Sequence, residues 1–121
     1  CGSCHLAYPA RMLSSADWAQ SMKGLDRHFG ENASLDKQDW QHISAYLARY
    51  AGDGRKRMYQ TDTATPGEPR LTTTGWFVHK HRKVKDADFR LKRVGSAANC
   101  AACHRDAERG EFDDDTAKIP R

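Results

Sequence analysis

The feature that most constrains this chain is a five-residue pattern that occurs twice. The two copies are Cys1-Gly2-Ser3-Cys4-His5 and Cys100-Ala101-Ala102-Cys103-His104. Two cysteines three positions apart face the same side of a helical turn, so each thiol can bond to one vinyl group of a single porphyrin, and the adjacent histidine can reach the iron. The pattern is typical of c-type haem attachment and predicts one covalently bound haem for each copy.

Paired cysteines at this spacing also build four-cysteine zinc sites, and a single pair can form a redox dithiol. The histidines favour haem, because at this chain's own histidine content both pairs would be followed by one about once in 400 sequences. Zinc knuckles usually lie some 12 to 20 residues apart, whereas these motifs lie at opposite ends of the sequence. The expected cofactors are therefore two covalently bound c-type haems.

Composition agrees with a fold that depends on its cofactors. Only 38% of the 121 residues are apolar, below the roughly 45–50% usual for globular chains. Two porphyrins would supply large apolar bodies for a short chain to fold around, as a metal does in other small domains. We expect the chain without haem to be largely unfolded. All four cysteines lie in the two motifs, so haem attachment would leave no thiol free for a disulfide.

Covalent haem attachment indicates export, and in bacteria a periplasmic location. Residue 1 is already a motif cysteine, so a processed or trimmed chain is expected. No run of about 20 apolar residues predicts a membrane span. The net charge of +4 is modest and would be roughly cancelled by haem propionates. The basic residues do not alternate with aromatic ones, so no nucleic-acid partner is expected.

Two helices are expected in the amino-terminal half. Ser14 or Ser15 can cap the first, and Ser34 or Asp36 the second. Apolar residues recur at helical spacing in both: Trp18, Met22 and Leu25 in the first, and Trp40, Ile43, Leu47 and Tyr50 in the second. Gly24 lies near the end of the first helix and Gly52 near the end of the second. The intervening His28-Phe29-Gly30 predicts a turn in which Gly30 takes a positive φ.

The composition changes to Gly, Thr, Asp and Pro between Ala51 and Gly75, which disfavours both helix and strand. We place a domain boundary within residues 52–75. The predicted fold class is mainly α, with two small haem-binding domains, residues 1–60 and residues 61–121.

Two further helices are expected in the carboxy-terminal half. Thr73 or Thr74 can cap one that carries Phe77, His81 and Val84 on one face. Ser96 can cap the other, which would contain the second motif and run to Arg109, with Gly110 as its stop. The basic run from Lys80 to Arg93 is either a solvated face or a binding patch, and the former is preferred. The tail is expected to be an irregular strap, docked by Phe112 and Ile119.

Six histidines are candidates for the four axial positions of two haems. His5 and His104 are the proximal ones, which leaves His28, His42, His79 and His81 for the distal positions, in competition with Met12, Met22 and Met58. His28 is preferred at the first haem because it lies in a turn between helices. His42 lies off the apolar stripe of its helix and is expected to be exposed, and Met22 is expected in the core.

At the second haem, His81 is preferred over His79. His81 shares a helix face with Phe77 and Val84, whereas His79 would project about 160° away on the same helix. This preference depends on that helix extending through residue 84.

Further residues extend the pattern beyond the two motifs: Tyr8-Pro9, Trp18, His28-Phe29-Gly30, the helix from Ile43 to Tyr50, and Trp76-Phe77 with Lys80-His81. With the motifs, they resemble the bacterial dihaem cytochrome c family over nearly the whole chain. The resemblance implies a first domain like a class I cytochrome c, a second haem domain of its own kind, and bis-histidine ligation at both irons. It also implies electron delivery to a small oxygen-binding monohaem cytochrome c. Ordinary class I cytochromes differ in having a distal-loop methionine, which this first domain lacks.

The predicted function is therefore that of a periplasmic, monomeric electron carrier rather than an enzyme. A membrane quinol-linked cytochrome is a possible donor. The rival interpretation is a small haem enzyme or gas-binding protein in which one iron keeps an open sixth position. No convergent acid and base residues near either motif favour that rival.

Overall fold

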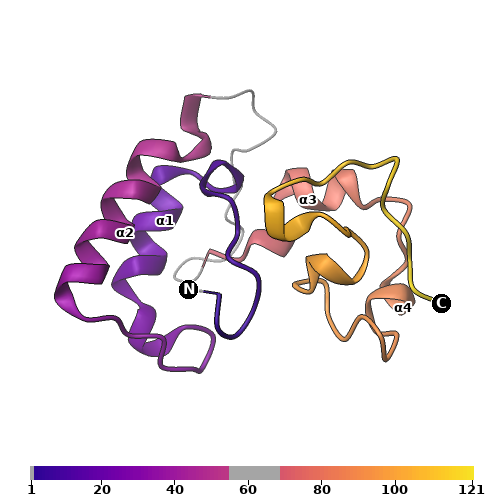
Figure 1. Cartoon of the computed structure of the whole chain (residues 1–121), viewed down its shortest axis with the longest axis horizontal. Coiled ribbons are helices and arrows are strands. Elements are labelled where there is room, and N and C mark those ends of the chain that lie inside the picture. The colour runs from indigo at the N-terminus through magenta and orange to yellow at the C-terminus, as the bar shows by residue number, and fades with distance from the viewer. Residues whose placement is uncertain (1, 55–68) are drawn as a thin grey trace. The chain divides into compact units, whose positions relative to one another are not determined.

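The computed structural model describes residues 2–54 and 69–121, which form two compact units (Figure 1). We call Ala10–His79 the helical unit, and Cys1–Pro9 together with Lys80–Arg121 the motif unit. Both attachment motifs thus belong to the motif unit. The division into haem domains 1–60 and 61–121 stays a prediction, since much of the proposed boundary lies outside the described residues.

The helical unit contains the two helices expected in the amino-terminal half. Helix α1 spans Ser15–Lys23 and begins where the Ser14 hydroxyl accepts a hydrogen bond from the Asp17 amide. Helix α2 spans Lys37–Tyr50, and the Asp36 carboxylate accepts from the Asp39 amide in the same way. Each cap satisfies one of the amides that a helix leaves unpaired at its start. The predicted starts of both helices are confirmed.

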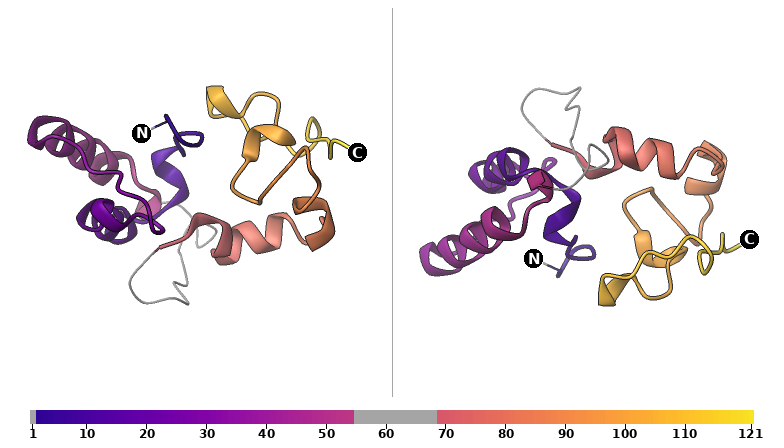
Figure 2. Two further views of the ribbon diagram at one scale, coloured as in Figure 1. Left: turned by 90° about the horizontal axis from the view of Figure 1, so that it is seen from below. Right: turned by 90° about the horizontal axis from the view of Figure 1, so that it is seen from above.

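Helices α1 and α2 lie side by side in every view (Figures 1 and 2). Ala10, Met22 and Leu47 are buried between them. Trp18, Leu25, Leu35 and Ile43 pack against this cluster. The predicted stripe on α2 is correct in its middle and wrong at both ends, because Trp40 is 37% and Tyr50 51% exposed.

Helix α3 spans Gly75–Lys80 and follows a 3₁₀ turn over Leu71–Thr73. The Thr74 hydroxyl accepts a hydrogen bond of 3.3 Å from the Phe77 amide, which confirms a threonine cap. The expected continuation through residue 84 is wrong: α3 ends at Lys80, and the Val84 amide donates to the carbonyl oxygen of His81 in a separate turn. His81 is therefore placed by the end of the helix rather than by one of its faces.

In the motif unit, α4 spans Asp86–Phe89, and short 3₁₀ turns cover Cys100–Ala102 and Ala107–Arg109. The single helix expected from residue 96 to 109 is wrong. The Ser96 hydroxyl accepts from the amide of Ala98, only two residues on, and such a local turn competes with helix capping. Gly110 adopts the left-handed conformation with φ 76°, which confirms it as the stop.

Little apolar protein surface is buried in the motif unit. Among its described residues, Val94 and Ala107 are the buried hydrophobic residues. A segment of this size cannot offset its conformational entropy with so small a core, so it requires another apolar body to pack around. A porphyrin at each attachment motif meets that requirement.

The fold class predicted from the sequence, mainly α, is confirmed: the described residues form helices and turns and no β-strand. None of the helices in this part of the chain has the length and apolar character needed to cross a membrane.

Candidate functional site

The second motif brings two histidines together. The rings of His81 and His104 lie nearly perpendicular, with centroids 6.1 Å apart and planes at 84°. His81 follows the last residue of α3, and His104 closes the motif by donating its amide hydrogen to the Cys100 carbonyl oxygen at 2.8 Å. That bond spans four residues, so the second motif does form one helical turn, as expected.

Aromatic side chains enclose this histidine pair. Phe89 lies 6.1 Å from the His81 ring, and Phe112 lies 5.4 Å from the His104 ring, measured between centroids. Burial lowers the pKa of His104, the neighbouring His81 lowers it further, and Asp114 acts in the opposite direction. The low pKa keeps the imidazole neutral at physiological pH, which is the form that binds a metal.

The two thiols of the second motif lie beside the histidine. The Cys100 sulfur lies 3.7 Å from the carbonyl oxygen of Ala98. Burial is the main cause that raises the pKa of Cys100, and also that of Cys103. A redox dithiol needs a lowered thiol pKa, so these cysteines do not have the environment of one. Thioether formation consumes the thiols and places no charge in this half-buried site, so the donor set fits a c-type haem.

In the first motif the geometry assigns the ring protons of His5. The Nδ1 atom of His5 lies 2.7 Å from the carbonyl oxygen of Leu6. A carbonyl oxygen can only accept, so Nδ1 is the donor, and in the neutral ring Nε2 is the unprotonated nitrogen. Metal-binding histidines are usually oriented in this way. The Tyr8 ring stacks on His5 at 4.9 Å. The residues from Ser3 to His5 form bends, so the expected helical turn is absent here, and Cys1 lies outside the described residues.

The predicted turn at His28 is confirmed and is tighter than expected. The Glu31 amide donates to the His28 carbonyl oxygen at 2.9 Å, while Phe29 and Gly30 have φ values of 48° and 86°. Two consecutive positive φ angles make a hairpin-type turn, in which a phenylalanine is an unusual residue. The Arg70 guanidinium lies over the Phe29 ring, 4.3 Å from its centroid.

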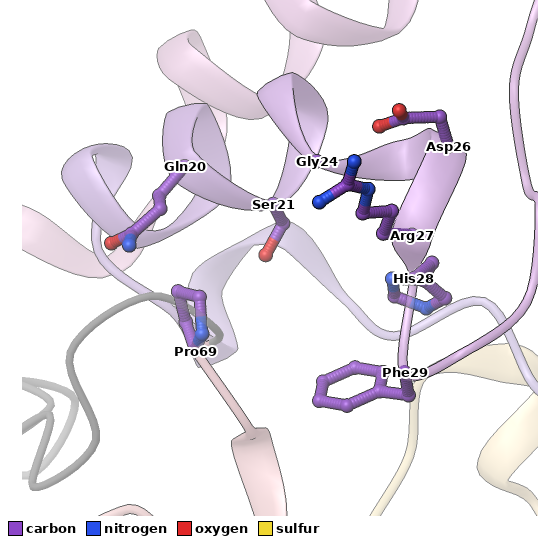
Figure 3. Close-up of a pocket in the computed structure, with 8 residues that line it drawn as sticks. All are labelled: Gln20, Ser21, Gly24, Asp26, Arg27, His28, Phe29 and Pro69. Atoms are coloured by element: carbon purple, nitrogen blue, oxygen red, sulfur yellow. The ribbon is translucent and has the colours of Figure 1, made fainter.

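His28 also lines a pocket of about 200 Å³ in the helical unit (Figure 3). Its lining residues are Gln20, Ser21, Gly24, Asp26, Arg27, His28, Phe29 and Pro69. In Figure 3 the His28 and Phe29 rings lie at one end of the pocket and Gln20 at the other. His28 and Phe29 contact each other edge to face at 4.7 Å. The turn therefore places one potential metal ligand at the rim of a partly polar hollow.

The remaining candidate ligands lie elsewhere. His42 is exposed on α2, as expected, and His79 is exposed on α3. Met12 and Met22 are buried in the helical unit, with 6% and 5% of their surfaces exposed. Met58 lies outside the described residues. Of the four preferred ligands, the structure brings His81 and His104 together, whereas His5 and His28 belong to different units.

Sequence reasoning missed several contacts around the second motif. Phe89 follows an acidic pair in α4, a signal for a short helix that the surrounding basic run obscured. Lys80 forms an ion pair with Asp114 of the tail, which no local pattern predicts because the two residues are far apart in the sequence. The predicted docking of the tail by Phe112 is confirmed, since Phe112 lies beside His104, and the Lys118 amide donates to the Cys103 carbonyl oxygen at 3.0 Å. Docking by Ile119 stays a prediction.

Known proteins resemble this chain over nearly its whole length. The model of the dihaem cytochrome c family matches residues 1–112. A dihaem c-type cytochrome from Shewanella baltica OS155 is 36% identical, with a TM-score of 0.83 over 99% of this chain and 87% of that one. Two structures of the dihaem cytochrome c of Rhodobacter sphaeroides are 39% and 38% identical, with TM-scores of 0.74 and 0.76, over 93% of this chain and 90% of theirs. No curated protein matches the chain.

Proposed function

The chain belongs to the dihaem cytochrome c family, and from this membership we propose that it is an exported electron carrier of the bacterial periplasm. It carries two covalently bound c-type haems, and it is an electron-transfer protein. The zinc interpretation of the cysteine pairs is therefore excluded. Within the proposal, Cys1 and Cys4 hold the first haem, and Cys100 and Cys103 hold the second.

The spacing of the His81 and His104 rings carries the proposal for the second haem. An imidazole nitrogen binds a first-row metal at about 2.0–2.1 Å and the ring centroid lies about 1.1 Å beyond it, so two imidazoles on opposite sides of one iron have centroids about 6.3 Å apart. The observed separation is 6.1 Å. Perpendicular planes suit such a pair because each ring can rotate about its bond to the metal. His104 is thus the proximal ligand and His81 the distal one.

For the first haem we propose His5 as the proximal ligand and His28 as the distal one. The hydrogen bond from His5 Nδ1 to the Leu6 carbonyl oxygen supports this, since it orients the ring and assigns the proton to Nδ1, as in metal-binding histidines. The turn at His28 also supports it, because the hydrogen bond from the Glu31 amide to the His28 carbonyl oxygen holds the backbone of His28 in one conformation. Met22 is less suited to be a ligand because its side chain packs in the protein core with Ala10 and Leu47.

When bound, each haem supplies one Fe(III)/Fe(II) couple. The protein's part is to hold both axial positions and to exclude competing ligands. Bis-histidine ligation closes both irons to substrates while leaving electron transfer through the haem edge possible, and it favours potentials below those of His/Met cytochromes. No bond is made or broken in this role, so the protein would not be an enzyme.

For partners, we propose a small oxygen-binding monohaem cytochrome c as acceptor and a membrane quinol-linked cytochrome as donor, with the carrier itself monomeric. The likeness to bacterial dihaem cytochromes over nearly the whole chain supports this assignment. Mixing the reduced protein with such a monohaem cytochrome in a stopped-flow spectrometer tests it. Transfer at a rate no faster than to an unrelated cytochrome would refute the partner and leave the carrier role intact.

Carbon monoxide separates the carrier from the gas-binding alternative. With both sixth positions occupied by histidine, the ferrous protein at neutral pH should bind carbon monoxide slowly and far below one equivalent. The visible spectra of the oxidised and reduced forms should both be low-spin. Rapid, stoichiometric binding at one haem would refute the closed-site proposal and favour a haem enzyme or gas sensor.

A further inference from the structure

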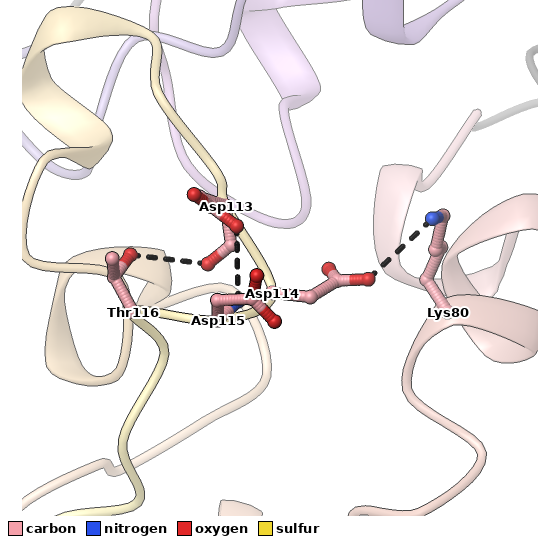
Figure 4. A network of polar contacts seen from close by, with 5 residues as sticks. All are labelled: Lys80, Asp113, Asp114, Asp115 and Thr116. Carbon is pink, nitrogen blue, oxygen red and sulfur yellow. Dashed lines mark hydrogen bonds and ion pairs between the residues drawn. The ribbon is translucent and has the colours of Figure 1, made fainter.

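The tail of the motif unit brings one carboxylate to Lys80, the residue before His81. Beyond Phe112, where the match to the family model ends, the chain turns back over Asp113, Asp114, Asp115 and Thr116 (Figure 4). The side chain of Asp114 extends toward Lys80, and its Oδ2 atom lies 3.6 Å from the lysine Nζ.

This position is held by a specific local structure. The Asp113 carboxylate accepts a hydrogen bond of 2.9 Å from the Asp115 amide, and the Asp113 carbonyl oxygen accepts one of 3.1 Å from the Thr116 hydroxyl. Such a turn fixes the backbone of the residue inside it. Asp114 is that residue, so its direction is set by the turn rather than by the ion pair alone.

Both ends of the turn are anchored to the second motif. On one side Phe112 packs against the His104 ring at 5.4 Å, and on the other the Lys118 amide bonds to the Cys103 carbonyl oxygen. Asp114 is thus tied to the proximal side through its own segment, and to the distal side through Lys80, the residue before His81.

The ring of His104 has a polar atom that a nearby negative charge could stabilise. Its Nδ1 atom is buried and has no hydrogen-bond partner among the described residues, whereas the equivalent atom of His5 bonds to a backbone carbonyl. A histidine bound to iron through Nε2 exposes a polar N–H at Nδ1, and a nearby negative charge stabilises it. Asp114 lies two residues beyond Phe112, which packs on this ring.

We propose that Asp114 is a positioning residue that stabilises the oxidised state of the second haem, and that Lys80 opposes it with a charge of the other sign. The inference rests on the proposed His81–His104 ligation. A carboxylate near a metal favours the more positive oxidation state, and a cation disfavours it. The two opposite charges shift the reduction potential of the second haem in opposite directions, so their effects partly cancel.

The test measures both potentials by spectroelectrochemistry of the complete dihaem protein in four variants. At a fixed applied potential, Asp114→Asn should raise the reduced-to-oxidised ratio of the second haem about threefold, which is about 28 mV for a one-electron couple. Lys80→Met should lower that ratio, and the double variant should lie between the two. Asp114→Glu, which keeps the charge, should stay near the parent value. The potential of the first haem should change in none of them.

Asp115→Asn is the matched control, because it removes the same charge from the next residue, whose side chain is exposed like that of Asp114. Equal shifts in the Asp114 and Asp115 variants would overturn the inference, since any tail charge would then suffice. Shifts of the second potential in the same direction in Asp114→Asn and Lys80→Met would also overturn it, because removal of opposite charges must shift that potential in opposite directions. A high-spin signal in Asp114→Asn would overturn the charge role and leave the His81–His104 ligation standing, whereas a high-spin second haem in the unaltered protein would refute that ligation.

Discussion

The hydroxyl group of Tyr8 donates a hydrogen bond of 3.2 Å to the carbonyl oxygen of Ala98. Tyr8 lies four residues after Cys4, and Ala98 lies two residues before Cys100, whose sulfur contacts the same carbonyl oxygen at 3.7 Å. One acceptor thus links the segments that carry both attachment motifs, although 90 positions separate the bonded residues in the sequence. The link accounts for the grouping of Cys1–Pro9 with Lys80–Arg121 in one unit.

Removing that hydroxyl tests the link. Tyr8→Phe keeps the ring that stacks on His5 and deletes the donor, so the free energy of unfolding should fall by about 1 kcal/mol, the usual value of one intramolecular hydrogen bond. Urea unfolding of the dihaem protein, followed by haem absorbance, measures the change. Tyr50→Phe is the control: its ring is 51% exposed, and this variant should unfold at the parent midpoint. Equal unfolding midpoints for all three proteins would show that the Tyr8–Ala98 hydrogen bond does not stabilise the fold.

A second prediction concerns the distal ligand of the second haem. His81→Ala should convert about half of the haem to a high-spin form, because one of the two irons loses its sixth ligand. His79→Ala should leave the spectrum low-spin, since His79 is exposed on α3, whereas the His81 ring lies 6.1 Å from His104. The two histidines are separated by one residue, so the pair of variants is closely matched. The opposite pattern of spectra would transfer the ligand role to His79.

A third prediction uses the pH dependence of stability. Asp53 accepts hydrogen bonds of 2.6 Å from both the amide and the hydroxyl of Ser15, at the start of α1. Those bonds are the main cause that lowers the pKa of Asp53 below its ordinary 3.8. A carboxyl whose pKa is lower in the folded state stabilises that state above pH 3.8, and the stabilisation is lost as the pH falls through the folded value.

Asp53→Ala should accordingly lower the free energy of unfolding by about 0.5–1 kcal/mol at pH 7, a small value because the carboxylate is exposed. The difference from the parent should shrink as the pH falls below 3.8. Thermal melts of both proteins from pH 7 to pH 3 measure it. Asp39→Ala, which removes a carboxylate from the first turn of α2, should cost less. A difference that stays constant down to pH 3 would exclude the ionised carboxylate as its source.

Local chemistry made part of this structure predictable from the sequence. The caps at Ser14, Asp36 and Thr74 were predictable because a side-chain oxygen beside a helix start has few competing roles. Gly30 and Gly110 were predictable because positive φ angles favour glycine. The haem attachment motifs were predictable because covalent chemistry fixes their residue types and spacing.

Other features depend on tertiary contacts that leave no local pattern. The segment from Ser96 to Arg109 has the composition of a helix, yet the chain there forms short turns over Cys100–Ala102 and Ala107–Arg109. His81 was chosen for a helix face that ends one residue before it. The choice of residue stays a prediction, and the turn after α3 places the His81 ring 6.1 Å from the His104 ring.

The last prediction concerns the strained turn beside His28. A left-handed backbone costs a residue with a side chain about 1–2 kcal/mol, and Phe29 has a φ of 48°. Its ring offsets that cost through the Arg70 guanidinium at 4.3 Å and the His28 ring at 4.7 Å, contacts of a kind worth about 0.5–1.5 kcal/mol each. Phe29→Ala removes the ring and keeps the strain, whereas Phe29→Gly removes both.

Phe29→Gly should therefore be more stable than Phe29→Ala by about 1 kcal/mol, the reverse of the usual order of these two residues. Both should be less stable than the parent, and both should raise the high-spin fraction of the first haem in proportion to the loss, because the turn holds His28. Urea unfolding and the visible spectrum of the same samples provide the two measurements. Greater stability of the alanine variant would mean that the turn relaxes to a negative φ once the ring is gone, and the ring would then be the cause of the strain rather than its compensation.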